Sequence, residues 1–198
     1  MKLLIVCLCG MLVFSAKTDA SDAKNEKIDT AGKKAVVVYY SRTGSTKLVA
    51  EMIAGRLNAG LRRIEEVKKR KWLPTTLFFG GYEATSGKCS KLKPMDFSLE
   101  GYDLVFLGTP VWASKPTPAM NSFVAGADFT GKNVVLFFTM GGDKYKKAAE
   151  ILKKKIEAKG GIVQGTFGIQ TESTSGIKKA EEEKLLENAG KDLDGLLQ

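Results

Sequence analysis

The hexapeptide S-R-T-G-S-T at residues 41–46 separates two different kinds of sequence. Before it, A-V-V-V-Y-Y at 35–40 is β-branched, aromatic and uncharged, which indicates a strand buried on both faces. After it, apolar residues recur at helical spacing at Leu48, Val49, Met52, Ile53 and Leu57. A turn of hydroxyls and glycine between a strand and a helix is either an ordinary helix cap or a place where an anion binds.

The alternation of strand and helix continues along the whole chain. Further strands are predicted at 103–108, 133–140 and 162–169, with a weaker one at 62–67. Further helices are predicted at 116–124, 145–156 and 177–197. This order implies a parallel sheet with helices on both faces, in which ligands bind beyond the carboxyl ends of the strands. The loops that follow three of these strands, 41–46, 109–115 and 139–145, are therefore the candidate binding loops.

The N-terminal residues are predicted to lie outside the folded domain. Residues 1–20 place Lys2 before an apolar run that is too short to cross a bilayer comfortably, and small residues follow it. This pattern predicts a secretory signal peptide, with an uncleaved N-terminal anchor as the alternative. Residues 21–33 are polar and aperiodic, so we predict a flexible linker there and one domain over 34–198. The protein is accordingly expected to be exported, to the periplasm or the outside.

Charge and residue usage exclude several functions. The chain has a formal net charge of +9 and no histidine, which excludes imidazole as a base or metal ligand, and no metal site is predicted. The lysine runs lack interleaved aromatics, so no nucleic-acid partner is predicted, and we expect attraction to an acidic protein or to an anionic membrane surface. Without the leader, Cys89 is the last cysteine and no internal disulfide can form; it is either a redox thiol or a half-buried small residue.

The first loop has the composition of a phosphate site. Gly44 permits a tight turn, and Thr43, Ser45 and Thr46 offer hydroxyls beside the amides of a helix N-terminus. The loop lacks the lysine of the nucleoside-triphosphate loop and the glycines of the dinucleotide fingerprint, so a single phosphate is predicted. The alternative is that Ser45 or Thr46 only caps the helix.

The other two loops suit a flat ring. Trp112 stands just past the predicted 103–108 strand and is followed by small and polar residues, so it either stacks on a ligand or belongs to the core. Gly141 and Gly142 either let backbone amides approach a ligand or simply form the turn into the next helix. A phosphate at one end and a flat heterocycle at the other describe flavin mononucleotide (FMN).

With these loops in view, the sequence resembles the flavodoxin family from about Lys34 to Thr171. The resemblance rests on V-V-Y-Y-S-R-T-G-S-T-K-L-V-A at 37–50, Y-D-L-V-F-L-G-T-P-V-W-A at 102–113 and V-V-L-F-F-T-M-G-G at 134–142. Residues 78–88 also look like a segment of a flavodoxin-like subgroup of uncharacterised bacterial and archaeal proteins. The resemblance implies a three-layer α/β/α sandwich with a five-stranded parallel sheet in the order 2-1-3-4-5, non-covalent FMN and electron transfer.

The resemblance also implies the binding residues, with none that is catalytic in the acid–base sense. The phosphate would lie at the first loop, at Ser41, Thr43, Gly44, Ser45 and Thr46, with Arg42 either neutralising it or pointing into water. One side of the ring would meet Thr109, Pro110, Val111, Trp112 and Ala113. Its other edge would meet Thr139, Met140, Gly141 and Gly142, and Tyr145 is the candidate cover of its outer face.

Two departures from the family pattern bear on function. Carrier flavodoxins are usually acidic, whereas this chain is basic, which predicts a different partner and a less negative flavin potential. Ala113 and Ser114 stand where carriers tend to have glycine, and this weighs against one-electron behaviour. The leading hypothesis is an FMN-binding electron-transfer protein that serves a redox partner protein. The alternatives are an FMN-dependent reductase of a quinone or similar acceptor, and a binding module that has lost its flavin.

Overall fold

The computed structural model describes residues 27–67, 89–171 and 179–197. At its centre lies a parallel sheet in the order β2-β1-β3-β5-β6. These strands are β1 (Ala35–Tyr39), β2 (Gly60–Arg63), β3 (Leu104–Trp112), β5 (Asn133–Met140) and β6 (Ile162–Gln170). The short β4 (Lys115–Pro116) pairs antiparallel with the end of β3. The predicted order 2-1-3-4-5 is confirmed for the parallel strands, and β4 is a sixth strand that the sequence did not indicate.

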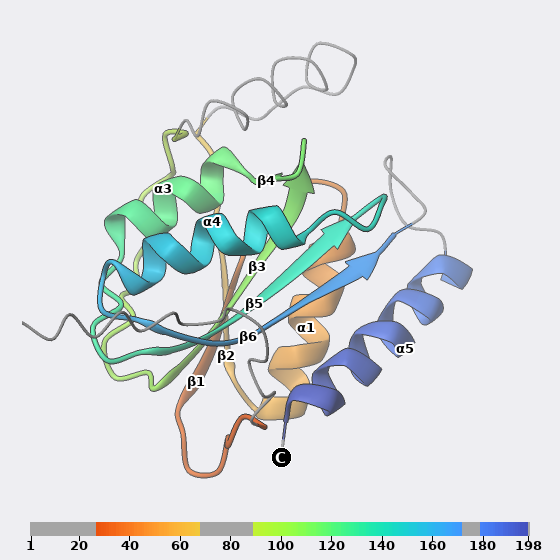
Figure 1. Cartoon of the computed structure of the whole chain (residues 1–198), viewed down its shortest axis with the longest axis horizontal. Coiled ribbons are helices and arrows are strands. Elements are labelled where there is room, and N and C mark those ends of the chain that lie inside the picture. The colour runs from red at the N-terminus through yellow and green to blue at the C-terminus, as the bar shows by residue number, and fades with distance from the viewer. Residues whose placement is uncertain (1–26, 68–88, 172–178, 198) are drawn as a thin grey trace, which may run out of the picture.

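In the described part of the chain, helices cover both faces of this sheet (Figure 1). They are α1 (Ser45–Leu57), α3 (Pro118–Gly126), α4 (Lys146–Glu157) and α5 (Lys179–Leu196). The helices α3 and α4 lie on one face, and α1 and α5 lie on the other. The predicted three-layer α/β/α arrangement is thereby confirmed.

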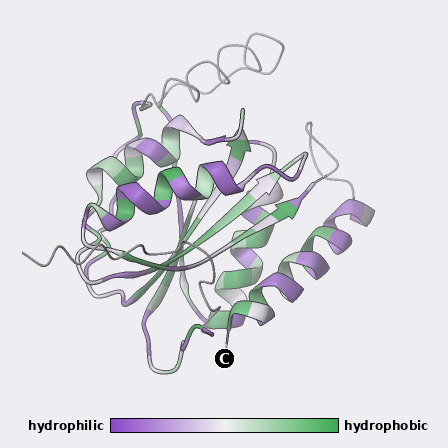
Figure 2. Ribbon diagram, viewed as in Figure 1, coloured by the Kyte–Doolittle hydropathy of each residue, from purple (hydrophilic) through white to green (hydrophobic). Residues whose placement is uncertain are grey.

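The strands are apolar on both sides because each side faces a layer of helices. In β5, Val134, Leu136 and Phe138 pack in the core beneath α3 and α4. The alternate residues Val135 and Phe137 pack in the core beneath α1 and α5. Figure 2 shows the consequence: the central strands are largely hydrophobic, and the helices carry hydrophilic residues on their outer sides. A strand of this kind gives a continuous apolar run rather than an alternating one.

The folded contacts begin earlier than the expected domain boundary at residue 34. Ile28 is buried, and its amide donates to the Leu196 carbonyl at 2.6 Å, so part of the expected linker at 21–33 packs against the end of α5. The predicted leader at 1–20 and the segment 78–88 lie outside the described residues. Within those residues, none of the helices is long and apolar enough to cross a membrane.

Candidate functional site

The three candidate loops meet at the carboxyl edge of the sheet. The Tyr40 amide, just after β1, donates to the Gly108 carbonyl on β3 at 2.9 Å. Further along β3, Pro110 lies opposite Thr139 on β5. The Thr46 and Thr139 hydroxyls are 2.7 Å apart, which ties the first turn of α1 to the end of β5. The topology thus brings together residues that are distant in sequence, as the sheet order requires.

The first loop leaves the start of α1 without a side-chain cap. The N-cap residue is Gly44, at φ 112°, and within the described residues α1 has no side-chain cap hydrogen bond. Thr46 is buried and bonded to Thr139, and Ser45 is inside the helix and buried, so neither caps it. The Ser41 hydroxyl accepts from the Gly44 amide at 3.2 Å and holds the loop closed. The first-turn amides and the positive end of the helix dipole therefore remain available to an anion.

Trp112 is held between two side chains from the β1 end of the site. The Tyr40 ring meets it edge-on, with 6.0 Å between ring centroids and an interplanar angle of 80°. The exposed Arg42 guanidinium lies 5.8 Å from the centre of its ring, a cation–π contact. Tyr40 is itself fixed, because its hydroxyl donates to the buried Glu66 carboxylate at 2.7 Å. Trp112 is only half-buried, so it belongs partly to the core and partly to the loop surface.

The second loop is a two-residue hairpin turn between β3 and β4. Ala113 and Ser114 both have positive φ, at 49° and 59°, and Trp112 pairs with Lys115 across the turn. A turn with positive φ at both central residues is a type I′ turn, which favours Asn-Gly and is strained for other residues. The sequence A-S therefore keeps Trp112 in place at a local cost in backbone energy.

Replacing Ala113 with glycine should stabilise the fold. We expect Ala113→Gly to raise the free energy of unfolding by about 1 kcal/mol, because glycine adopts positive φ without the steric cost of a Cβ atom. Urea unfolding measures this free energy. Ala158→Gly is the control: Ala158 lies at φ −63° at the end of α4, so the variant should lose stability. Equal effects in the two variants would contradict the strain assigned to Ala113.

The third loop combines exposed backbone with a packed aromatic. Gly141 and Gly142 are exposed, and the Met140 carbonyl is engaged by the Thr171 amide at 2.7 Å. Tyr145 stacks on Phe138 at 5.8 Å, and a Cβ atom placed on Gly168 would lie 2.3 Å from its ring. Tyr145 therefore lies against the sheet beside β6, and its predicted role as a cover of the flavin remains a prediction.

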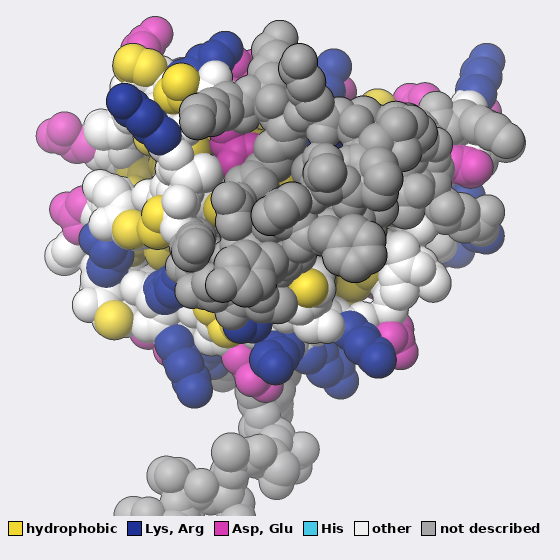
Figure 3. Space-filling view, turned by 90° about the horizontal axis from the view of Figure 1, so that it is seen from above, with side chains coloured by type: hydrophobic (Ala, Val, Ile, Leu, Met, Phe, Trp, Pro, Cys, Tyr) yellow, Lys and Arg dark blue, Asp and Glu magenta, His cyan; other side chains and the backbone are white. Residues whose placement is uncertain are grey.

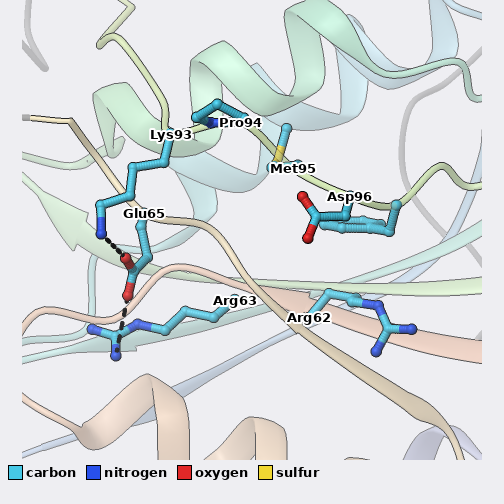
Figure 4. Close-up of a pocket in the computed structure, with 8 residues that line it drawn as sticks. Arg62, Arg63, Glu65, Lys93, Pro94, Met95 and Asp96 are labelled. Atoms are coloured by element: carbon cyan, nitrogen blue, oxygen red, sulfur yellow. Dashed lines mark hydrogen bonds and ion pairs between the residues drawn. The ribbon is translucent and has the colours of Figure 1, made fainter.

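A hollow next to the loops has no clear signal in the sequence. A pocket of about 290 Å³ is lined by Tyr40, Ser41, Arg42, Arg63, Ile64, Glu65, Glu66 and Lys93. It shares Arg63, Glu65 and Lys93 with a second pocket of about 440 Å³ (Figure 4). Glu65 lies between Lys93 and Arg63, with N–O distances of 2.5 and 3.8 Å. Only the charged run R-R-I-E-E at 62–66 could have pointed to this edge, and it looks like an ordinary strand end.

Comparison with known proteins agrees with this geometry. A family model described as Flavodoxin matches residues 85–166. A protein described as a flavoprotein from Bacteroides uniformis shares the fold at a TM-score of 0.62 and 23% identity, over 77% of this chain and 97% of its own. The chain is flavodoxin-like. The resemblance seen in the sequence is thereby confirmed at the level of the fold, and the family model covers the second and third loops.

Two other solved structures share the flavodoxin-like fold. A Bacteroides eggerthii protein described as a flavoprotein matches at a TM-score of 0.61 and 22% identity, over 80% of this chain and 98% of its own. A Lactobacillus acidophilus flavoprotein in complex with FMN matches at a TM-score of 0.59 and 21% identity, over 77% of this chain and 98% of its own. No curated protein matches the sequence. At these identities the likeness shows the fold of the flavodoxin-like chain, and the binding residues stay predictions.

Cys89 does not contribute a buried side chain to this fold. It is exposed and forms no disulfide, so it is not the half-buried small residue that was one of its two interpretations.

Proposed function

We propose that this flavodoxin-like protein binds FMN and takes part in electron transfer. The observation that carries the proposal is that three loops meet at one edge of the sheet. The Thr46–Thr139 contact joins the first loop to the third, and the contacts of Tyr40 and Arg42 with Trp112 join the first to the second. Its support from other proteins is the Lactobacillus acidophilus flavoprotein, whose structure in complex with FMN has the same fold.

The first loop fits the phosphate of FMN. Gly44 at φ 112° turns the chain so that α1 starts without a side-chain cap, and its first amides are free to donate to an anion. Within the described residues, the Thr43 and Ser45 hydroxyls make no hydrogen bond and can serve as further donors. Arg42, an exposed residue of this loop, adds positive charge there.

The second and third loops fit the ring. Trp112 is half-buried and fixed by the hairpin turn, so one of its edges or faces can meet a planar ligand. The exposed backbone of Gly141 and Gly142 lies at the neighbouring strand end, where amides can approach a ligand closely. FMN would supply the redox chemistry when bound, and the chain would bind it, orient it and tune its potential.

Truncating Trp112 should change the flavin more than it changes the fold. We expect Trp112→Ala to weaken FMN binding at least about fivefold, since an aromatic contact contributes on the order of 1 kcal/mol beyond the area it buries. The flavin absorption bands should shift as well. Tyr102→Ala is the matched control, because Tyr102 is a partly buried aromatic at the opposite end of β3. Unchanged FMN binding and an unchanged flavin spectrum in Trp112→Ala would show that Trp112 is a core residue and does not contact the flavin.

A reductase of a quinone or similar acceptor is the second candidate function. The observation that favours it is the pocket of about 290 Å³, which includes Tyr40 and Arg42, the two residues that contact Trp112. A second substrate could enter there beside the ring. The strained Ala113–Ser114 turn also supports this candidate, because a turn already held at positive φ has little freedom to change between redox states.

An anaerobic potentiometric titration separates the two candidates. Two resolved one-electron steps, with slow turnover of a soluble benzoquinone, are expected of a carrier. A single two-electron step with fast benzoquinone turnover is expected of a reductase and would overturn the carrier assignment. If the protein neither binds FMN nor quenches its fluorescence, both the carrier and the reductase are excluded, and the binding module that has lost its flavin is favoured.

A further inference from the structure

The two outer helices α4 and α5 carry opposite charge on opposite faces of the sheet. The helix α4 has five lysines against two glutamates, a net charge of +3. The helix α5 has three lysines against six carboxylates, a net charge of −3. Because α4 packs on one face and α5 on the other, these two helices place opposite charge on opposite faces of the sheet (Figure 1). Such a polarity orients a charged partner as it approaches.

The lysines at the start of α4 oppose the stability of that helix. Lys146 and Lys147 occupy its first turn, which contains no acidic residue, and Tyr145 provides no side-chain cap. Cations at a helix N-terminus are unfavourable by roughly 0.3–1 kcal/mol each, because the helix dipole is positive there. Residues that break a local rule in this way are expected at functional surfaces. Lys144, one residue before the N-cap, adds a third exposed lysine, next to the exposed Asp143 of the third loop.

These lysines lie where an electron would enter or leave the proposed flavin. Lys144, Lys146 and Lys147, here called the α4 lysine patch, are all exposed and flank Tyr145 at the end of the 139–145 loop. In Figure 3, Lys and Arg side chains and Asp and Glu side chains both recur around the rim of the view. A partner drawn to the patch would place its own redox group close to Gly141 and Gly142.

The patch suits an acidic protein better than a membrane. A helix that binds lipid presents an apolar face to the bilayer. In α4 the apolar residues Ala148, Ala149, Leu152 and Ile156 are buried against the sheet, and the remaining one, Ile151, is partly buried. The exposed large hydrophobic residues in the described part of the chain are Val67, Met95 and Ile162, none of which is in α4.

We propose that the α4 lysine patch is the docking surface for an acidic redox protein that exchanges electrons with the flavin. This inference rests on the proposed function for its redox step and on the charges of α4 for its location. In one exchange, a single electron leaves the partner's reduced centre, which is oxidised, and reduces the bound FMN. No proton has to cross the interface for that step.

Two double variants of equal charge test the docking surface. Lys146→Glu with Lys147→Glu alters the patch, and Lys153→Glu with Lys154→Glu makes the same charge change farther along the same helix. The two pairs are about 10 Å apart along the axis at 1.5 Å per residue, close to the Debye length of about 10 Å at 0.1 M salt. Glutamates also suit the start of a helix better than its end, so loss of helix stability would affect the distal variant more.

The readout is the rate at which a reduced, acidic plant-type [2Fe–2S] ferredoxin reduces the FMN-loaded protein in a stopped-flow instrument. Because steering by charge changes association rates by about 10- to 1,000-fold, we expect the patch variant to lose at least tenfold at low salt. The distal variant should lose less than about threefold, and added salt should shrink the difference. FMN affinity should be the same in all three proteins.

Several results would overturn the docking surface. Equal losses in the two variants would show that only net charge matters, and no loss in either would show that the partner docks elsewhere. A patch variant that keeps its ferredoxin rate but loses binding to phosphatidylserine vesicles would assign the patch to a membrane. If the chain bound no FMN, the proposed function would fail by itself. Ferredoxin binding to the FMN-free chains, measured by surface plasmon resonance, would then decide the docking surface by the same comparison of variants.

Discussion

Replacing Gly44 with valine is expected to abolish tight FMN binding while the apo fold survives. Gly44 has φ 112°, a conformation that a β-branched residue adopts only as an outlier. The strain of roughly 1–3 kcal/mol would be relieved by rearranging the loop, which moves the first amides of α1 away from the phosphate. We expect the FMN affinity to fall at least about tenfold, since each 1.4 kcal/mol is a factor of ten. A fluorescence titration with FMN measures the affinity.

A second glycine of the same helix provides the control. Gly55 lies inside α1, does not have positive φ, and has no atom within 4 Å of the place that a Cβ atom would take. Gly55→Val should leave FMN binding unchanged and stability unchanged or slightly raised, because glycine is unfavourable within a helix. If Gly44→Val bound FMN as well as Gly55→Val does, the phosphate would not lie at the 41–46 loop.

Replacing Gly108 with alanine is expected to give the largest loss of stability. A Cβ atom at Gly108 would lie 2.1 Å from Cζ of Phe137. That ring is fully buried and stacks on Phe167 at 5.9 Å, so it has little room to move. Overpacking of this kind costs about 3 kcal/mol at the upper end of its usual range. Thermal unfolding should then show a fall of roughly 2–4 °C for each kcal/mol.

A compensating variant makes this prediction specific. Adding Phe137→Leu to Gly108→Ala removes the ring that the new methyl group would meet, so the double variant should recover part of the lost stability. Gly126→Ala at the end of α3 is the control, because no atom lies within 4 Å of its Cβ position. It should change stability by less than about 0.5 kcal/mol. A Gly108→Ala variant as stable as Gly126→Ala would contradict the packing described around Phe137.

The fold could be predicted because its signals are local and repeated. The strand β5 is a continuous apolar run since both of its faces are covered, and α4 shows clear helical spacing since one of its faces is buried. The strand β4 could not be predicted, because two residues carry no periodicity and Ala113 and Ser114 are not typical of a type I′ turn. The burial of Ile28 also left no signal, as one apolar residue in a polar stretch has no pattern.

The candidate site could be predicted only in outline. The strand ends indicated which loops would meet, but the partners of each side chain depend on tertiary structure. Thr46 was expected to face a phosphate or to cap the helix. Gly44 is the N-cap, and the Thr46 hydroxyl contacts that of Thr139, so only its role toward a phosphate stays a prediction. Arg42 was predicted either to neutralise the phosphate or to point into water, and its guanidinium lies over the Trp112 ring. Glu66, which fixes Tyr40, sits after β2 and has no feature in the sequence that connects it to the site.

Binding of FMN with its phosphate at the 41–46 loop is the property on which the proposed function depends. The most direct test is a pair of fluorescence titrations of the purified chain, one with FMN and one with riboflavin, which has the same ring and no phosphate. We predict saturable quenching of FMN at one site per chain and at least tenfold weaker binding of riboflavin, because charge-assisted hydrogen bonds to the phosphate would be lost. No quenching of FMN, or equal affinity for the two flavins, would contradict this mode of binding.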